Sequence, residues 1–161
     1  MASLDGLRAD VRAAAVELVA RARAAGEPVI VASTLRTPAE QDRLCRAGYS
    51  RVCGDAGAHT MGLAFDVALL GAGGPEWPTT PEGRARWERV GAIGESLGLV
   101  WGGRWPTPDW PHFQARDAQA RVNARLASRR AAVPLALALG AAIVAYLALA
   151  PRRRARRRRA R

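Results

Sequence analysis

The sequence predicts a single α+β domain in residues 1–115, followed by a separate C-terminal segment. The length of 161 residues suits one ordinary domain with an appendage and is too short for two cores of normal size. Within residues 1–115, stretches with helical spacing of apolar side chains alternate with short runs rich in β-branched residues. The 16 Gly and 10 Pro favour a loop-rich domain over a long helical bundle.

Caps, prolines and glycines set the expected boundaries of these elements. Thr37, Pro38 and Glu40 have the pattern of a helix N-cap, a first-turn proline and a capping-box partner. Gly26 and Gly98 are expected to stop the helices that precede them. The expected elements are, in chain order, a helix from Ser3 or Asp5 to Gly26, a strand over 28–33, a helix over 38–47, a loop over 48–58, a strand over 63–69, a loop over 71–81, a helix over 81–97, a loop from 99 onward and a short strand over 112–114.

The positive charge of the chain is confined to its C-terminus. Residues 1–115 hold 12 of the 25 basic residues and 13 of the 14 acidic ones, a net charge of −1. Residues 116–161 hold 13 Arg and one Asp, a net charge of +12. Because the domain itself is nearly neutral, the overall charge of +11 does not predict a nucleic-acid partner.

The C-terminal segment has the composition of a membrane anchor. An Arg-rich connector, expected to be helical, occupies 116–130, and the twenty residues 131–150 contain no charge. Twenty helical residues span about 30 Å, the thickness of the hydrocarbon core of a bilayer. The basic tail, 151–161, would bind anionic lipid headgroups. A buried or interfacial helix stays an alternative, since nine of the twenty residues are Ala. The N-terminus is amphipathic and does not have the pattern of a signal peptide.

Two cysteines, Cys45 and Cys53, are separated by seven residues and have no second pair. They fit neither a zinc ribbon nor a thioredoxin-type motif. Two interpretations stay open. Each cysteine is a free buried thiol, or the two form a short-loop disulfide that would stabilise the fold by about 2–3 kcal/mol in an oxidising compartment.

The only two histidines, His59 and His112, each stand near an aspartate. Asp66 follows His59 by seven residues and falls inside an expected strand, after a turn that Gly62 permits. A carboxylate within an apolar strand is costly to bury unless it is paired or binds a cation. Asp109 stands three residues before His112.

Two imidazoles and one carboxylate are a common ligand set for Zn²⁺, which keeps its fourth position for water. A further carboxylate nearby can take the proton of that water. Spacing alone leaves a second interpretation open, in which each stretch holds a hydrogen-bonded core histidine with a capping aspartate.

Several motifs occur in a definite order along the domain. They are Ser33-Thr-Leu-Arg36-Thr-Pro-Ala-Glu-Gln41, then His59-Thr-Met-Gly-Leu-Ala-Phe-Asp66-Val67, then Trp101-Gly-Gly-Arg-Trp105 with Asp109-Trp-Pro-His112-Phe-Gln114. Together they resemble the motifs of the zinc D-Ala-D-Ala carboxypeptidase and L-alanyl-D-glutamate endopeptidase family, which includes many phage endolysins. The resemblance covers about residues 28–114. It implies a compact α+β fold of the hedgehog/D,D-peptidase type, with a small antiparallel sheet and flanking helices.

The resemblance also implies a role for each motif residue. His59, Asp66 and His112 match the ligands of the Zn²⁺ cofactor. Asp109 matches the general base, and Arg36 matches the arginine that binds the substrate and polarises its carbonyl group.

Two further residues, Gln41 in the first motif and Trp110 beside the second histidine, are expected to contact the substrate. The chain departs from the family pattern at Gly57, where the family usually has serine, and in the rather short segment 48–57. Neither departure affects an expected ligand, so both bear on substrate preference and not on metal binding.

The implied function is a zinc-dependent peptidase that hydrolyses the stem peptides of bacterial peptidoglycan. Asp109 before the Pro-His-Phe element favours the L-alanyl-D-glutamate endopeptidase type, an endolysin whose monomeric catalytic domain acts at the cell wall. The domain would reach the wall after holin-dependent release or by translocation, and residues 131–161 would bind the membrane. Three alternatives are a membrane-anchored D-Ala-D-Ala carboxypeptidase, a non-catalytic zinc-bearing wall-binding module, and a membrane-disrupting cationic C-terminus.

Overall fold

The structure is a computed structural model and describes residues 2–131. The sheet and three α helices lie in one compact unit that ends at Asn123, and a second unit begins at Ala124. The described elements are α1 (Ala9–Ala24), β1 (Val29–Ser33), α2 (Pro38–Arg46), the 3₁₀ helix η1 (His59–Met61), β2 (Ala64–Gly71), β3 (Gly74–Pro75), α3 (Pro81–Ser96), β4 (Leu99–Trp101), the 3₁₀ helix η2 (Gly102–Arg104) and β5 (His112–Ala115), followed by helical residues 118–131.

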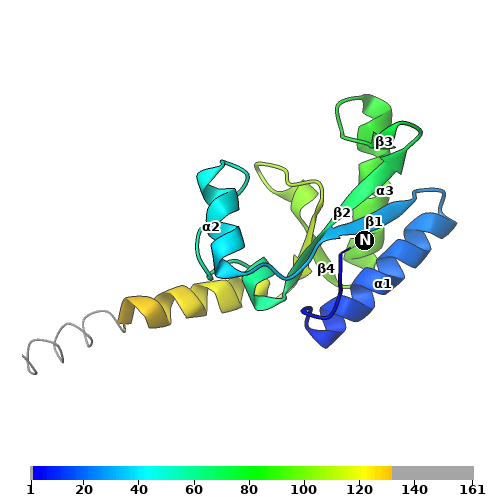
Figure 1. The fold of residues 1–161 in the computed structure, drawn as a ribbon. Coiled ribbons are helices and arrows are strands. Elements are labelled where there is room, and N and C mark those ends of the chain that lie inside the picture. The colour runs from blue at the N-terminus through cyan, green and yellow to red at the C-terminus, as the bar shows by residue number, and fades with distance from the viewer. Residues whose placement is uncertain (1, 132–161) are drawn as a thin grey trace, which may run out of the picture. The chain divides into compact units, whose positions relative to one another are not determined.

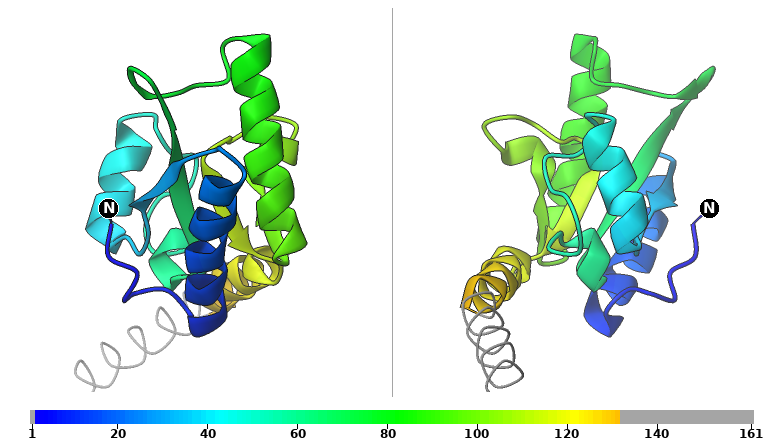
Figure 2. Two further views of the ribbon diagram at one scale, coloured as in Figure 1. Left: turned by 90° about the vertical axis from the view of Figure 1, so that its right-hand side faces the viewer. Right: turned by 60° about the vertical axis from the view of Figure 1, so that its left-hand side comes forward.

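An antiparallel sheet of order β1-β2-β5-β4 forms the centre of the first unit, and the short β3 pairs with β2 (Figure 1). Helices α1 and α3 lie against one face of the sheet, and α2 lies on the other side (Figures 1 and 2). This arrangement confirms the α+β class and the small antiparallel sheet. It leaves the face nearer α2 open for polar side chains.

Alternation along β2 separates the core from the open face. Phe65, Val67 and Leu69 point into the core, each at most 1% exposed, whereas Asp66 between them is only partly buried. A strand places successive side chains on opposite faces, so one strand serves both the core and the site. Trp87 and Trp101 are buried in the same core.

Helix α3 approaches the sheet through two glycines. A Cβ atom at Gly91 would lie 2.2 Å from the Trp101 ring, and one at Gly94 would lie 2.3 Å from the Phe113 ring. Any side chain at these positions would force the helix away from β4 and β5. The close approach therefore holds β5, the strand that carries His112, against the core.

Two elements differ from the sequence prediction. Helix α1 begins at Ala9, and not after Ser3 or Asp5, because the preceding residues form a turn and bond to other segments: Leu7 N donates to Leu4 O, and Arg8 N donates to Gly62 O. Strand β4 was expected to be loop. Its three residues are too few to show a period of two, and pairing with β5 defines the strand.

The C-terminal predictions fall mostly outside the described residues. The connector is helical over 118–131, as its sequence indicates. Among residues 2–131, no helix combines the length and the apolar character that crossing a bilayer requires. Apart from Ala131, the predicted anchor 131–150 and the tail 151–161 lie outside the described part of the chain.

Candidate metal centre and active site

Three side chains predicted to bind a metal come together on the open face of the sheet. His59 is in η1, Asp66 is on β2 and His112 begins β5. The antiparallel register places Asp66 directly opposite His112. Gly62 ends η1 with φ of 65°, and a Cβ there would lie 2.3 Å from Gly6 O, so this turn into β2 requires glycine. The turn returns the chain so that His59 lies beside the other two residues.

The donor atoms of the three residues form a nearly equilateral triangle. His59 Nε2 lies 3.2 Å from Asp66 Oδ1 and 3.3 Å from His112 Nδ1. His112 Nδ1 lies 3.2 Å from Asp66 Oδ1. Ligands about 2.0–2.1 Å from a tetrahedral Zn²⁺ lie roughly 3.3 Å from one another. The three atoms therefore fit one face of a zinc tetrahedron.

Hydrogen bonds behind the rings determine which nitrogens face this point. His59 Nδ1 lies 2.7 Å from the carbonyl oxygen of Thr34, so Nδ1–H donates and Nε2 carries the lone pair. His112 Nε2 lies 3.1 Å from Gln114 Oε1, so Nε2–H donates and Nδ1 carries the lone pair. When both rings are neutral, their two lone pairs and the Asp66 carboxylate converge as three acceptors. A cation satisfies this arrangement, because it is attracted to all three lone pairs.

Both carboxylate oxygens of Asp66 have polar partners. Oδ1 faces the two histidines, and Oδ2 accepts a hydrogen bond from Arg36 Nη2. Burial would raise the pKa of Asp66, but the hydrogen bonds and charges of His112 and His59 outweigh it and hold the pKa well below its ordinary value. Asp66 is therefore an anion at neutral pH, as a metal ligand must be.

Arg36 lies beside the metal ligands and also lines the cavity above them. Its Nε donates to Ser33 Oγ at 3.0 Å, which fixes the plane of the guanidinium. The structure therefore gives Arg36 a contact that sequence reasoning did not include, since it orients a ligand. Its predicted role toward the substrate stays a prediction.

A cavity of about 790 Å³ opens over the three ligands, and Asp109 lines it. Asp109 precedes β5 in a tight turn in which His112 N donates to Asp109 O at 3.2 Å. Partial burial of the carboxyl group raises the pKa of Asp109 above its ordinary value, and the negative charge of Asp66 adds to this effect, while His112 opposes it. The residue predicted as general base is thus near the ligands, with an increased affinity for a proton.

Gln41 and Trp110, both predicted to contact substrate, have different positions. Gln41 lines the cavity, and its Oε1 is buried without a hydrogen-bond partner among the described residues. Trp110 does not line this cavity, because its ring packs against Trp101 with a centroid distance of 5.5 Å. The aromatic side chain next to the ligands is Trp105, whose ring centroid lies 5.1 Å from that of His112.

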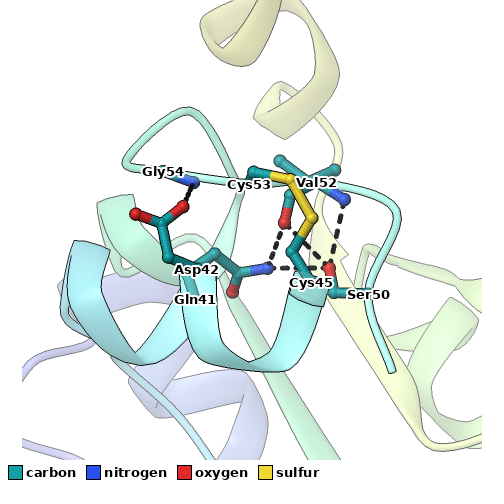
Figure 3. Close-up of a disulfide and its surroundings, with 7 residues drawn as sticks. All are labelled: Gln41, Asp42, Cys45, Ser50, Val52, Cys53 and Gly54. Atoms are coloured by element: carbon teal, nitrogen blue, oxygen red, sulfur yellow. Dashed lines mark hydrogen bonds between the residues drawn. A yellow bond between two sulfur atoms is a disulfide. The ribbon is translucent and has the colours of Figure 1, made fainter. Parts of the chain in front are cut away.

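The wall of the cavity on the side of α2 is fastened by a disulfide between Cys45 and Cys53 (Figure 3). Of the two interpretations that the sequence left open, the structure contains the disulfide. Gln41 Nε2 donates to Ser50 Oγ and to Val52 O, both at 2.7 Å, and fastens the same loop to α2. Sequence reasoning missed these loop residues, because nothing in their spacing connects them with the histidines.

Residues 54–115 match the model of a peptidase M15 family described as D-alanyl-D-alanine carboxypeptidase. The folded domain belongs to the M15 metallopeptidase family. The matched residues of this M15 domain contain the three candidate ligands and Asp109. The family resemblance predicted from the motifs is confirmed.

Individual M15 relatives agree with this assignment. The chain is 32% identical to the peptidoglycan L-alanyl-D-glutamate endopeptidase CwlK of Bacillus subtilis (strain 168), over 60% of this chain and 66% of the relative. The crystal structure of the L-Ala D-Glu endopeptidase ChiX of Serratia marcescens matches with a TM-score of 0.57 and 27% identity, over 73% of this chain and 86% of that chain.

A more distant structure shares the fold. The vancomycin resistance D,D-pentapeptidase VanY, crystallised as a mutant in complex with Zn(II), matches with a TM-score of 0.52 and 18% identity, over 73% of this chain and 76% of that chain. Its sequence is too distant to indicate more than a common fold for this M15 domain.

Metal binding by this site can be tested without a substrate. The full-length chain should bind one Zn²⁺, and Gln114→Leu should weaken binding by about 10–100-fold, because His112 loses the partner that sets its tautomer. Zinc affinity is measured by competition with a chromophoric chelator. Asp109→Asn is the control and should keep the wild-type affinity. Equal affinities for wild type and Gln114→Leu would contradict the assigned tautomer.

Proposed function

We propose that this M15 protein is a zinc-dependent peptidoglycan peptidase of the L-alanyl-D-glutamate endopeptidase type, which hydrolyses the stem peptides of the bacterial cell wall. The observation that carries the proposal is the convergence of His59, Asp66 and His112 donor atoms beside Asp109 in one open cavity. The endopeptidase type is supported by CwlK and ChiX, both named as L-alanyl-D-glutamate endopeptidases. The aspartate before Pro111-His112 supports it as well.

His59, Asp66 and His112 would hold the Zn²⁺, which when bound supplies Lewis-acid chemistry that acidifies water and polarises a carbonyl group. Asp109 takes the proton of the attacking water and returns it to the nitrogen of the leaving amine. A raised pKa suits both steps, because the carboxylate must gain a proton and then release it. Asp109 also lies on the segment that leads into His112, which keeps it beside the ligands.

Arg36 stabilises the negative charge that develops on the substrate's carbonyl oxygen. Its guanidinium has five N–H donors, and only Nε and Nη2 have partners that orient it, Ser33 and Asp66. The remaining donors are held in place by those two bonds. A donor fixed before the reaction stabilises the transition state without reorganisation, which typically contributes several kcal/mol.

Gln41 is placed to position the substrate backbone. The residue lines the cavity, and its Oε1 is a buried acceptor without a partner among the described residues, which an N–H of the bound substrate would satisfy. Its amide nitrogen is already used by Ser50 and Val52, which prevents the side chain from turning away. The family serine that Gly57 replaces would stand within van der Waals distance of this group, since a Cβ at Gly57 lies 3.9 Å from Gln41 Cδ.

On acidification, the peptidase activity should begin to decline at a pH above the ordinary pKa of an aspartate side chain. The raised pKa of Asp109 means that the carboxylate, the form that acts as base, is lost earlier on acidification than for an exposed aspartate. Profiles of kcat/KM against pH should show this acidic limb. Asp109→Asn should lose about 10²–10⁴-fold in rate and retain bound zinc. A variant at Asp109 with the wild-type kcat/KM would show that a different group acts as the base.

A D-Ala-D-Ala carboxypeptidase is the second candidate, because the matched family model carries that description. Both enzymes would use the same ligands and the same base. They differ in their products, since the carboxypeptidase releases only a terminal alanine and the endopeptidase separates the stem from its first alanine. Mass analysis of the products therefore distinguishes them.

Digestion of purified peptidoglycan tests the proposed function. The full-length chain should release peptides that begin with D-glutamate, and a chelator should abolish the release until Zn²⁺ is restored. His112→Ala, which removes one ligand, serves as the inactive control. Release of free alanine alone would support the carboxypeptidase, and intact peptidoglycan with the zinc-loaded wild type would contradict a hydrolytic function.

We also propose that residues 131–150 anchor the protein in a membrane and that the tail 151–161 binds anionic lipid, in an endolysin whose domain acts on the wall side. The uncharged stretch and the eight Arg among the last ten residues support this. In spheroplasts, external protease should digest a translocated domain while a cytosolic marker stays intact. Digestion only after lysis of the inner membrane would favour holin-dependent release.

A further inference from the structure

Most charged side chains that line the cavity form ion pairs. The exceptions are one acidic residue and one basic residue. Arg36 is bound to Asp66, and Glu76 is bound to Arg86. Asp109 has the proposed role of base. The remaining charged residue of the lining is Arg51, and no carboxylate of the described residues lies within ion-pair distance of its guanidinium. An exposed cation on the wall of a substrate cavity is available for an anionic group of the substrate.

Arg51 is held in a loop with little freedom to move. The disulfide between Cys45 and Cys53 joins the far end of the loop to α2, and the Gln41 amide bonds to both neighbours of Arg51, Ser50 and Val52 (Figure 3). The backbone of residue 51 is therefore fixed from both sides. A positioned cation binds an anion more tightly than a mobile one, because less conformational entropy is lost on binding.

The guanidinium of Arg51 extends toward the segment that carries Asp109. Its Nη2 lies 3.5 Å from Thr107 Oγ1, two residues before Asp109. In the proposed mechanism, Asp109 delivers a proton to the nitrogen of the leaving residue. The substituents of the leaving residue therefore lie near residues 107–109, on the same side of the cavity as Arg51.

The chemistry of the substrate places a carboxylate at that position. A glutamyl residue has two carboxyl groups, and only one of them continues the peptide chain. Cleavage of an L-alanyl-D-glutamyl bond therefore has a leaving residue with a free carboxylate. Cleavage of a D-alanyl-D-alanine end has one too, the C-terminal carboxylate.

We propose that Arg51 determines specificity by binding the free carboxylate of the residue on the leaving side of the scissile bond. The proposal rests on the proposed peptidase function and adds a recognition group to it. Arginine binds a carboxylate with two parallel hydrogen bonds, which lysine cannot reproduce. Substrates that lack this charge should be cleaved less efficiently.

The test compares two synthetic peptides with the zinc-loaded full-length protein. Both contain an L-alanyl-D-glutamyl bond, and the remaining glutamate carboxyl is free in one and amidated in the other. Wild type should cleave the free acid with a kcat/KM about 10–100-fold higher, as expected for a lost hydrogen bond between charged groups. Arg51→Gln should reduce this preference to near unity, chiefly by raising KM for the free acid, and Arg51→Lys should restore part of it.

Two further variants separate this role from general effects. Arg46→Gln removes the same charge from an exposed position of α2 outside the cavity lining and should keep the wild-type preference. The double variant Cys45→Ser/Cys53→Ser releases the loop and should weaken the preference while zinc affinity stays unchanged. A preference that survives in Arg51→Gln, or a wild type that cleaves both peptides equally, overturns the role of Arg51. A wild type that cleaves neither peptide overturns the proposed function itself.

Discussion

Three hydrogen-bond acceptors converge on one point at the open face of the sheet, and the functional part of the molecule is arranged around this constraint. Asp66 Oδ1 and the lone pairs of His59 and His112 face each other at 3.2–3.3 Å. With neutral rings and no cation, the repulsion among these acceptors and the burial of the carboxylate would be unfavourable. The Thr34 carbonyl and the Gln114 side chain hold the rings in this state by accepting the other ring protons.

The scaffold meets this constraint with close backbone contacts. The register between β2 and β5 places Asp66 opposite His112, and α3 keeps β5 in position through Gly91 and Gly94, which allow the helix to contact the sheet. Gly62 returns the chain from η1 into β2. None of these contacts involves α2 or the loop that follows it. The metal centre and the substrate wall are therefore built from separate parts of the chain.

This separation agrees with the extent of the family match. The matched region, residues 54–115, includes every candidate ligand and Asp109, whereas Arg36, Gln41 and Arg51 precede it. The loop between Cys45 and Cys53 supplies a wall with its own charge and its own covalent fastening. The candidate metal ligands therefore lie inside the family match, and the residues proposed to select the substrate lie outside it.

Local signals in the sequence were sufficient to predict most helices and strands and to identify three residues as candidate metal ligands. The pattern Thr37-Pro38-Ala39-Glu40 places the start of α2, where Thr37 accepts a hydrogen bond from Glu40 N, and the alternation of Phe65, Asp66 and Val67 separates core from site. The start of α1 and the strand β4 were not predictable in this way. Their boundaries depend on hydrogen bonds to Gly62 and to β5, which are remote in sequence.

By itself, the sequence indicated two histidines and an aspartate as the candidate ligand set, because the chain has only two histidines, each near an aspartate, and their motifs follow the order of the family that they resemble. Only the tertiary structure decided that their donor atoms meet, that Arg36 orients Asp66, that Trp105 and not Trp110 adjoins the site, and that the cysteines are joined. The reason is physical. Distances between side chains from different elements are set by strand register and helix packing, which involve residues too far apart in sequence to leave a local pattern.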